Sequence, residues 1–343
     1  MPHVEQEFQT SPYADRTCWI AVGLLLITAV LFVASMVVGP VPITASDAWS
    51  AIVNANASPI ATVVNEIRLP RAILAIIIGA SLGISGAALQ ALVRNPLAEP
   101  GIIGVSALSA LGAVVVFYSG LASAHPLALP LGGITGALVA VIILLGLAGT
   151  GLSTLTLILA GVAINSLGGA LTALVLNLSP NPFAAYEIFF WLMGSLTNRS
   201  FDHVWVVLPF SLVGWLLLFG AARSLDVFVL GEEVASSLGV NITATRWLVV
   251  VGSALAVGAG VAVAGIIGFV GLVVPHLLRP VIGHRPVALL PLSGLGGASL
   301  TLAADVGCRL VVGNTELMLG VVTALIGAPF FLYLVLKTRS ELI

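Results

Sequence analysis

The stretch from Ala72 to Val93 constrains the fold most strongly, because it runs for 22 residues without a charged side chain. Arg68 and Arg71 precede it, and Arg94 follows it. A helix rises about 1.5 Å per residue, so the run reaches roughly 33 Å, enough to cross a bilayer core of about 30 Å. The stretch therefore predicts a transmembrane helix.

The composition places the rest of the chain in the same environment. Of the 343 residues, 59% are hydrophobic and 8% are charged, which leaves too little polar surface for a soluble domain. The formal net charge of -2 provides no basic field that would attract a nucleic acid. We expect a lipid bilayer as the surroundings and no nucleic acid partner.

Further charge-poor segments predict an all-α membrane protein, a polytopic bundle of about ten transmembrane helices. The uncharged run 247–278 could be one long helix or two short ones. Two helices put eight basic residues on the cytoplasmic side and four outside, as the positive-inside rule requires, whereas one helix gives five and seven. Both termini are then cytoplasmic, with a tail at 1–17 and a membrane domain at 18–343. The expected spans are 18–38, 72–93, 101–119, 126–148, 153–176, 204–222, 247–264, 267–283, 287–306 and 316–336.

The motif GIIG occurs twice, at 101–104 and at 265–268. In the expected topology the two copies enter the membrane from opposite faces, which indicates an inverted repeat of the kind common in transporters. Coincidence is the alternative, because the chain has 37 glycines. Glycines four residues apart, such as Gly79 and Gly83, or Gly132 and Gly136, predict close helix packing.

The polar loop 223–246 carries Val227, Leu230, Val234 and Leu238 at helical spacing. This pattern predicts a short amphipathic helix outside the membrane. Such helices on lipid surfaces usually carry Lys or Arg, whereas this one is acidic. We therefore favour docking into a groove of another protein over a position on the lipid surface.

Six motifs follow one another along the chain: RLPR (68–71), SGAALQ (85–90), RNPLAEPGIIGVS (94–106), GEEVASSLGV (231–240), GFVGLVVPHLLRP (268–280) and LGVVTALIGAPFFLYLV (319–335). Together they resemble the FecCD permeases, which are membrane subunits of bacterial ABC importers for iron chelates, haem and cobalamin. The resemblance implies a homodimer in the inner membrane with a pathway between the subunits, two cytoplasmic ATP-binding subunits and a periplasmic substrate-binding protein. The chain lacks the Gly-Lys-Ser/Thr of a P-loop, since its one lysine, Lys337, follows Leu336. We therefore expect ATP and Mg²⁺ on the partner ATPase, and no cofactor or metal site in this chain.

The resemblance also implies roles for two sets of residues. Arg68, Arg71 and Arg309 correspond by motif to periplasmic arginines that receive acidic side chains of the binding protein, and the planar fork of arginine suits a carboxylate. The alternative for Arg68 and Arg71 is anchoring of a helix at the lipid headgroups. The expected ATPase-coupling segment consists of Leu230, Gly231, Glu232, Glu233, Ala235, Leu238 and Gly239.

A gate and pathway are predicted with alternatives left open. Ser153 and Thr154 match the turn where related permeases narrow the pathway, although helix capping explains them equally well. Asn165 and Ser166 lie inside an expected span, where polar groups are costly unless they have partners or face water. They line the pathway or form an interhelical hydrogen bond.

The favoured cargo is an iron chelate, either a ferric siderophore or haem, with cobalamin as the alternative. An ion-coupled secondary transporter is a remote alternative, because the acidic residues cluster at the ends of spans and not near the midplane. An intramembrane serine protease is another, based on Ser85 in a GxSG pattern with His276 as a base. Ser85 lies on a face of small residues, which favours packing.

Overall fold

The computed structural model describes residues 12–53, 58–125, 127–148, 154–179, 182–311 and 317–340. Within these residues the chain is helical and has no strand. Six helices are long and apolar enough to cross a membrane, and four shorter apolar helices accompany them. These ten match the ten predicted spans one for one, which confirms the predicted fold class. Their bounds are α1 (Pro12–Val37), α4 (Leu69–Val93), α5 (Val105–Tyr118), α7 (Ala128–Ala148), α8 (Thr154–Asn177), α10 (Phe201–Phe228), α12 (Ile242–Ala264), α13 (Val270–Ile282), α14 (Pro286–Val311) and α15 (Leu319–Ser340).

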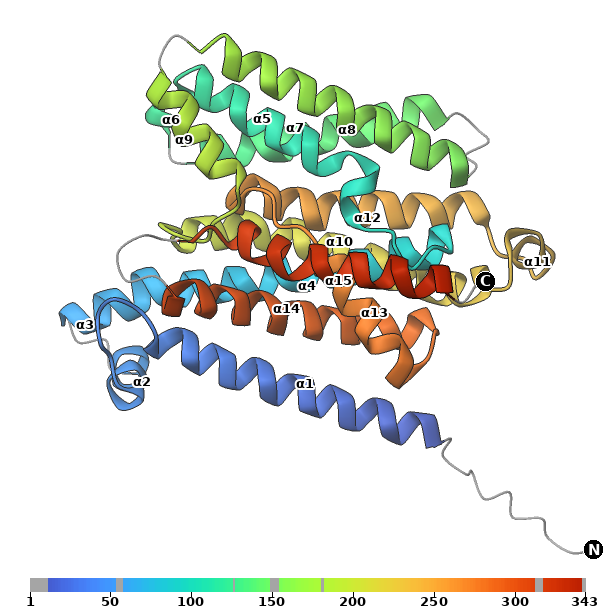
Figure 1. Cartoon of the computed structure of the whole chain (residues 1–343), viewed down its shortest axis with the longest axis horizontal. Coiled ribbons are helices and arrows are strands. Elements are labelled where there is room, and N and C mark those ends of the chain that lie inside the picture. Colours follow the sequence, from blue (N-terminus) through green and yellow to red (C-terminus); the bar gives the residue numbers. More distant parts are fainter. Residues whose placement is uncertain are drawn as a thin grey trace, which may run out of the picture.

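The ten helices lie roughly side by side, and shorter elements sit at the two ends of the bundle (Figure 1). One end carries the start of α1, the end of α15 and the helix α11 (Glu232–Ser237), and we call it the α11 end. The opposite end carries α2 (Ala45–Val53) and α3 (Pro59–Thr62), and we call it the α2 end. A π-helical turn (Val63–Arg68), a 3₁₀ turn (Pro100–Ile103), α6 (Leu121–Ala124) and α9 (Pro182–Leu192) complete the described elements.

The long uncharged run 247–278 forms two helices, as the distribution of basic residues predicted. Helix α12 ends at Ala264 and α13 begins at Val270. Gly265 has φ +74° at the break, and a Cβ there would lie 2.2 Å from the carbonyl oxygen of Trp191. Glycine is required here because it has no side chain to meet that oxygen.

Helix α4 lies at the centre of the bundle, and nearly all of its residues are buried. A Cβ on Gly79 would lie 2.3 Å from the oxygen of Gly297 on α14, and one on Gly83 would lie 1.9 Å from the oxygen of Ser293. The predicted close packing at these two glycines is therefore confirmed. Helix α1, in contrast, covers the outside of α14 and exposes most of its apolar side chains, as expected of a helix in lipid.

Two predicted segments lie at the ends of long helices. The N-terminal tail at 1–17 stays a prediction: α1 begins at Pro12, and residues 1–11 lie outside the described part. In the loop 223–246, Val227 still belongs to α10, and the predicted short helix outside the bundle is α11. Gly231, with φ +111°, separates α11 from the preceding turn.

Candidate functional site: two charged ends and a cavity between two broken helices

The three arginines of the predicted docking surface lie together at the α2 end; Arg68 is buried, and Arg71 and Arg309 are largely buried. Asp305 of α14 joins two of them: Arg71 Nε lies 2.8 Å from one carboxylate oxygen, and Arg309 Nη2 lies 2.7 Å from the other. The side chain of Asp305 is 1% exposed, and those of Arg71 and Arg309 are 11% and 8% exposed. This ion cluster joins α4 to α14.

Arg68 and Arg309 also donate hydrogen bonds to the backbone where α1 ends. Arg68 binds the carbonyl oxygens of Met36 (2.6 Å), Val37 (2.8 Å) and Val41. Arg309 binds those of Ser35 and Val38, both at 2.9 Å. The last carbonyls of a helix have no partner within the helix, so the two guanidinium groups supply hydrogen-bond donors to acceptors that the helix leaves unpaired.

The docking role of Arg68, Arg71 and Arg309 therefore stays a prediction, and the geometry adds a structural role for all three. Each guanidinium group already binds partners inside this chain. The acidic residues of the same end are different, because Glu66, Glu187 and Asp202 are exposed. Asp305 was missed as a cluster residue at the sequence level. Its i, i+4 spacing from Arg309 on one helix face is the signal that could have indicated the pair.

At the α11 end, Glu232 connects α11 to two spanning helices. Its Oε1 accepts a hydrogen bond from the hydroxyl of Thr154 at 2.7 Å, and its Oε2 lies 2.7 Å from Nη2 of Arg246. Thr154 is the first residue of α8, and Arg246 lies in the second turn of α12 and is 7% exposed. The predicted coupling segment and the predicted gate turn are thus in direct contact. Ser153, the other gate candidate, lies outside the described residues.

The charge of Glu232 is favoured in this contact. Burial on its own raises the pKa of Glu232, but hydrogen bonds from Thr154 and Arg246 and the charges of Arg246 and Arg94 outweigh burial and lower that pKa below its usual value. The carboxylate therefore stays ionised at neutral pH. Arg246 was not among the predicted site residues, because nothing in its sequence neighbourhood indicates that it faces Glu232.

The rest of the coupling segment presents apolar side chains outward. Leu230, Val234 and Leu238 are exposed by 64%, 42% and 63%, whereas Ala235, a residue of α11, is fully buried. Glu233, next to Glu232, is exposed. Gly239 has φ +82° and follows the helix end, a conformation that favours glycine. An apolar outer face with a buried anchor suits contact with another protein.

A cavity of about 360 Å³ lies where two broken helices meet. Both GIIG copies line it, through Gly101 and Ile102 of the first and Ile266 to Gly268 of the second, together with Asn165 and Ser166. Glu99, which sequence reasoning did not select, lines it too. The structure therefore brings the predicted pathway residues Asn165 and Ser166 together with the two GIIG copies.

The cavity lies at the start of two helices, α5 and α13, that are too short to cross the bilayer. Helix α5 has 14 residues and α13 has 13, about 20 Å each, which is less than a bilayer core. Each follows a GIIG copy, and the two run in opposite directions (Figure 1). Discontinuous helices at the interface of inverted repeats commonly form transporter binding sites.

Close packing holds α8 beside this cavity. A Cβ on Gly161 would lie 2.0 Å from the carbonyl oxygen of Ile102 in the first GIIG copy. Asn165 and Ser166 follow one turn later and are exposed on the face of α8. Polar side chains on a spanning helix are costly in lipid, so this face indicates contact with water or with another subunit.

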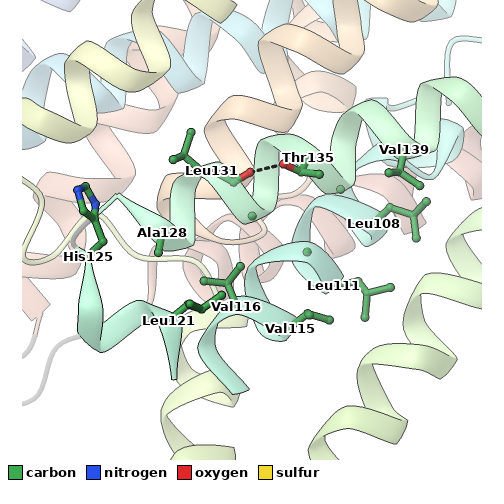
Figure 2. Close-up of a pocket in the computed structure, with 13 residues that line it drawn as sticks. Leu108, Leu111, Val115, Val116, Leu121, His125, Ala128, Leu131, Thr135 and Val139 are labelled. Carbon is green, nitrogen blue, oxygen red and sulfur yellow. Dashed lines mark hydrogen bonds between the residues drawn. The ribbon is translucent and has the colours of Figure 1, made fainter. Parts of the chain in front are cut away.

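A second cavity, of about 570 Å³, lies between α5 and α7 and is apolar (Figure 2). It forms where glycines bring the two backbones together: a Cβ on Gly136 would lie 1.9 Å from the oxygen of Leu108. Thr135 and His125 are the polar side chains among its lining residues, and the hydroxyl of Thr135 binds Leu131 O at 2.8 Å (Figure 2). This cavity offers little to a polar cargo.

Ser85 and His276, the two residues considered for a serine protease, both pack against other parts of the bundle. Ser85 is fully buried within α4, and the ring of His276 stacks edge-on against Phe330, with 5.7 Å between ring centroids. Within the described part of the chain, no three His, Cys, Asp or Glu side chains gather as metal ligands would. The absence of a cofactor in this chain stays a prediction.

Comparison with known proteins accords with this architecture. The FecCD transport family matches residues 26–337. The vitamin B12 import system permease protein of Vibrio cholerae is 39% identical over 99% of this chain and 98% of its own length. The hemin transport system permease protein of Yersinia pestis is 39% identical over 80% of this chain and 84% of its own length.

A solved structure agrees with these relatives. The inward-facing conformation of a metal-chelate type ABC transporter aligns with a TM-score of 0.81 and 32% identity, and covers 92% of this chain and 98% of that chain. Such permeases are membrane subunits and not enzymes, and a separate ATPase hydrolyses ATP. The protease alternative is therefore wrong. The chain is a multi-pass inner-membrane protein, and it belongs to the FecCD transport family of ABC importer permeases.

Proposed function

We propose that two copies of this chain enclose the pathway of an ABC importer for a metal chelate with a tetrapyrrole-type ring, with cobalamin as the favoured cargo. The cavity at the two GIIG copies, with Asn165 and Ser166 beside it, is the observation that carries the proposal. Cobalamin takes first place over the iron chelates expected from the sequence, because the relative that spans 99% of this chain is named for vitamin B12. Haem is second, supported by the hemin permease.

A second copy is supported by the exposed face of α8 and α9. Asn165 and Ser166 are polar and exposed on a spanning helix, and lipid would leave them without hydrogen-bond partners. Phe183 and Tyr186 of α9, exposed by 80% and 67%, add apolar surface nearby in the chain. A partner subunit on this face would cover the aromatic rings and leave the polar groups on a wet pathway.

We infer that the α11 end is cytoplasmic and receives the ATPase, with one ATPase subunit for each copy. The exposed Leu230, Val234 and Leu238 would enter a groove of that subunit. Movement of α11 would reach α8 and α12 through Glu232, which contacts Thr154 and Arg246. This contact would convert closure of the ATPase into a shift at the start of α8.

We infer that the α2 end receives the periplasmic binding protein. For Arg71 and Arg309 to contact it, a carboxylate of the binding protein would have to replace Asp305 as their partner. Arg68, which is 4% exposed, would have to leave three carbonyl oxygens of the α1 end. We therefore propose that the arginines act mainly as internal supports of the docking surface.

Reconstitution tests the proposal. The chain is placed in liposomes with its ATPase and with binding protein carrying cyanocobalamin, haemin or ferrichrome. We expect ATP-dependent uptake that is fastest with cyanocobalamin. Uptake of ferrichrome alone would contradict the cargo, and concentration of any of these by the chain without ATPase would contradict the importer assignment.

A further inference from the structure

A third cavity, of about 620 Å³, opens at the α11 end between the last turns of α4 and α13. Its volume lies within the range of ligand sites. Arg94, Arg279, His276 and His284 line it, and the described residues around it include no Asp or Glu. The cavity is therefore basic, and neither the transport pathway nor the coupling contact uses it.

Arg279 is held in place on one side and lacks a partner on the other. Its Nη2 donates to the side-chain oxygen of Gln90 at 2.6 Å. Gln90 is itself fixed, because its amide nitrogen donates to the carbonyl oxygens of Ala98 and Gly271 at 3.0 and 3.2 Å. The Nη1 of Arg279 is buried and has no hydrogen-bond partner among the described residues. A buried charged donor without an acceptor is costly, so an anion beside it would be stabilised.

The acidic residues closest along this end already have partners. Glu232 binds Arg246 and Thr154, and the charge of Arg94 also lowers its pKa. Asp226 lies 3.3 Å from Arg285 and accepts the backbone N–H of Val287 at 3.0 Å. Neither residue lines the cavity, so its positive charge is not neutralised from within.

The chemistry of the donors and the position of the cavity select the ligand. Arginine forks bind phosphate through paired hydrogen bonds. Helix α13, which forms one wall, exposes Leu277 and Val281 by 55% and 46% on an apolar surface suited to acyl chains. Basic pockets between spanning helices on the cytoplasmic side are suited to anionic lipid headgroups. We propose that this cavity binds the phosphate of an anionic phospholipid of the inner leaflet.

The test measures phosphatidylglycerol that stays bound to the purified full-length chain, by native mass spectrometry, with phosphatidylcholine as the zwitterionic comparison. The variants are Arg279→Gln and Arg94→Gln. Arg285→Gln is the matched control, since Arg285 lies at the same end and is 81% exposed but does not line the cavity. Thermal unfolding of each variant shows that it is folded. Arg94→Gln keeps the test decisive if Arg279→Gln does not fold, because Arg94 is an exposed residue just past the end of α4.

We expect wild type and Arg285→Gln to retain phosphatidylglycerol over phosphatidylcholine, and each cavity variant to bind it about fivefold more weakly. Equal retention by all variants, or equal loss in Arg285→Gln, would overturn the proposal. Displacement of the lipid by excess inorganic phosphate would show that free phosphate is the ligand. If Arg279→Gln weakened binding of the ATPase but not of phosphatidylglycerol, the cavity would serve a protein carboxylate and the lipid proposal would be wrong.

Discussion

The two ends of this bundle use arginine in opposite ways. At the α2 end, Arg68, Arg71 and Arg309 are buried, and their forks bind backbone carbonyls and Asp305. At the α11 end, Arg94 and Arg285 are exposed, and Arg246 binds Glu232, a carboxylate that connects α11 to the bundle. The α2-end cluster fixes helices to one another, whereas the α11 end keeps charge available for other molecules. The same residue type therefore has a different role at each membrane surface, depending on which acceptors the fold leaves unpaired.

Among the tests of this contrast, removal of the Asp305 carboxylate is expected to change the free energy of unfolding most. Asp305→Asn removes the buried carboxylate charge that Arg71 and Arg309 share, which is expected to destabilise the chain by about 3–5 kcal/mol. The matched change Asp226→Asn removes the partner of the exposed Arg285 and is expected to cost about 1 kcal/mol or less. Thermal unfolding in detergent measures both. Similar losses for the two variants would remove the distinction between the ends.

Arg68→Ala separates a structural role from a docking role. It removes hydrogen bonds from a charged group to three carbonyl oxygens, of which that of Met36 is buried, and is expected to cost about 2–3 kcal/mol. Arg68→Lys keeps the charge but not the fork, and it should recover little of the loss. Stability is measured by unfolding, and docking by the affinity for the binding protein. Unchanged stability with weakened docking would support the role implied by the family resemblance instead.

At the α11 end, adjacent glutamates form a matched pair. Glu232→Gln weakens the contact with Arg246 and Thr154 and is expected to reduce transport per ATP about five- to tenfold. Glu233→Gln changes an exposed neighbour on the same helix and should leave transport unchanged. Both are measured in liposomes with ATPase and loaded binding protein. Equal loss in the two variants would mean that the negative charge of α11 matters and the specific contact does not.

The smallest expected effect concerns pH. Because the pKa of Glu232 is lowered in the folded chain, its stabilising contribution is complete above the usual pKa of 4.5 and is lost as the pH falls through the lower folded value. The stability difference between wild type and Glu232→Gln should therefore be constant between about pH 5 and 8 and shrink in stronger acid. Unfolding measured across this range tests it. A difference that changes near neutral pH would contradict the contact.

The spans could be predicted from the sequence because hydropathy and charge act locally along a helix. The distribution of basic residues predicted the division of 247–278, and the four-residue spacing of Gly79 and Gly83 predicted their close packing. Helix α9 was missed, since its 11 residues are too few to cross a bilayer and its polar flanks resemble a loop. The lining of the GIIG cavity by Asn165 and Ser166 was predicted only as one of two alternatives.

Burial of the α2-end arginines could not be predicted, because it depends on tertiary structure. The acceptors of Arg68 are carbonyls at the end of α1, about 30 residues earlier in the chain, and no sequence pattern shows that α1 ends beside α4. A motif that places arginines at a membrane surface does not say which way their side chains turn. The contact of Glu232 with Thr154, 78 residues apart, has the same origin.

Arginine-selective labelling of the purified chain tests the contrast between the ends most directly. Phenylglyoxal modifies accessible guanidinium groups, and peptide mass spectrometry gives the extent at each site. We predict rapid modification of Arg94 and Arg285, and protection of Arg68, Arg71 and Arg309 until the chain is unfolded. Rapid modification of Arg68, Arg71 and Arg309 in the folded chain would contradict the account, because it would show that the α2 end offers its arginines to a partner.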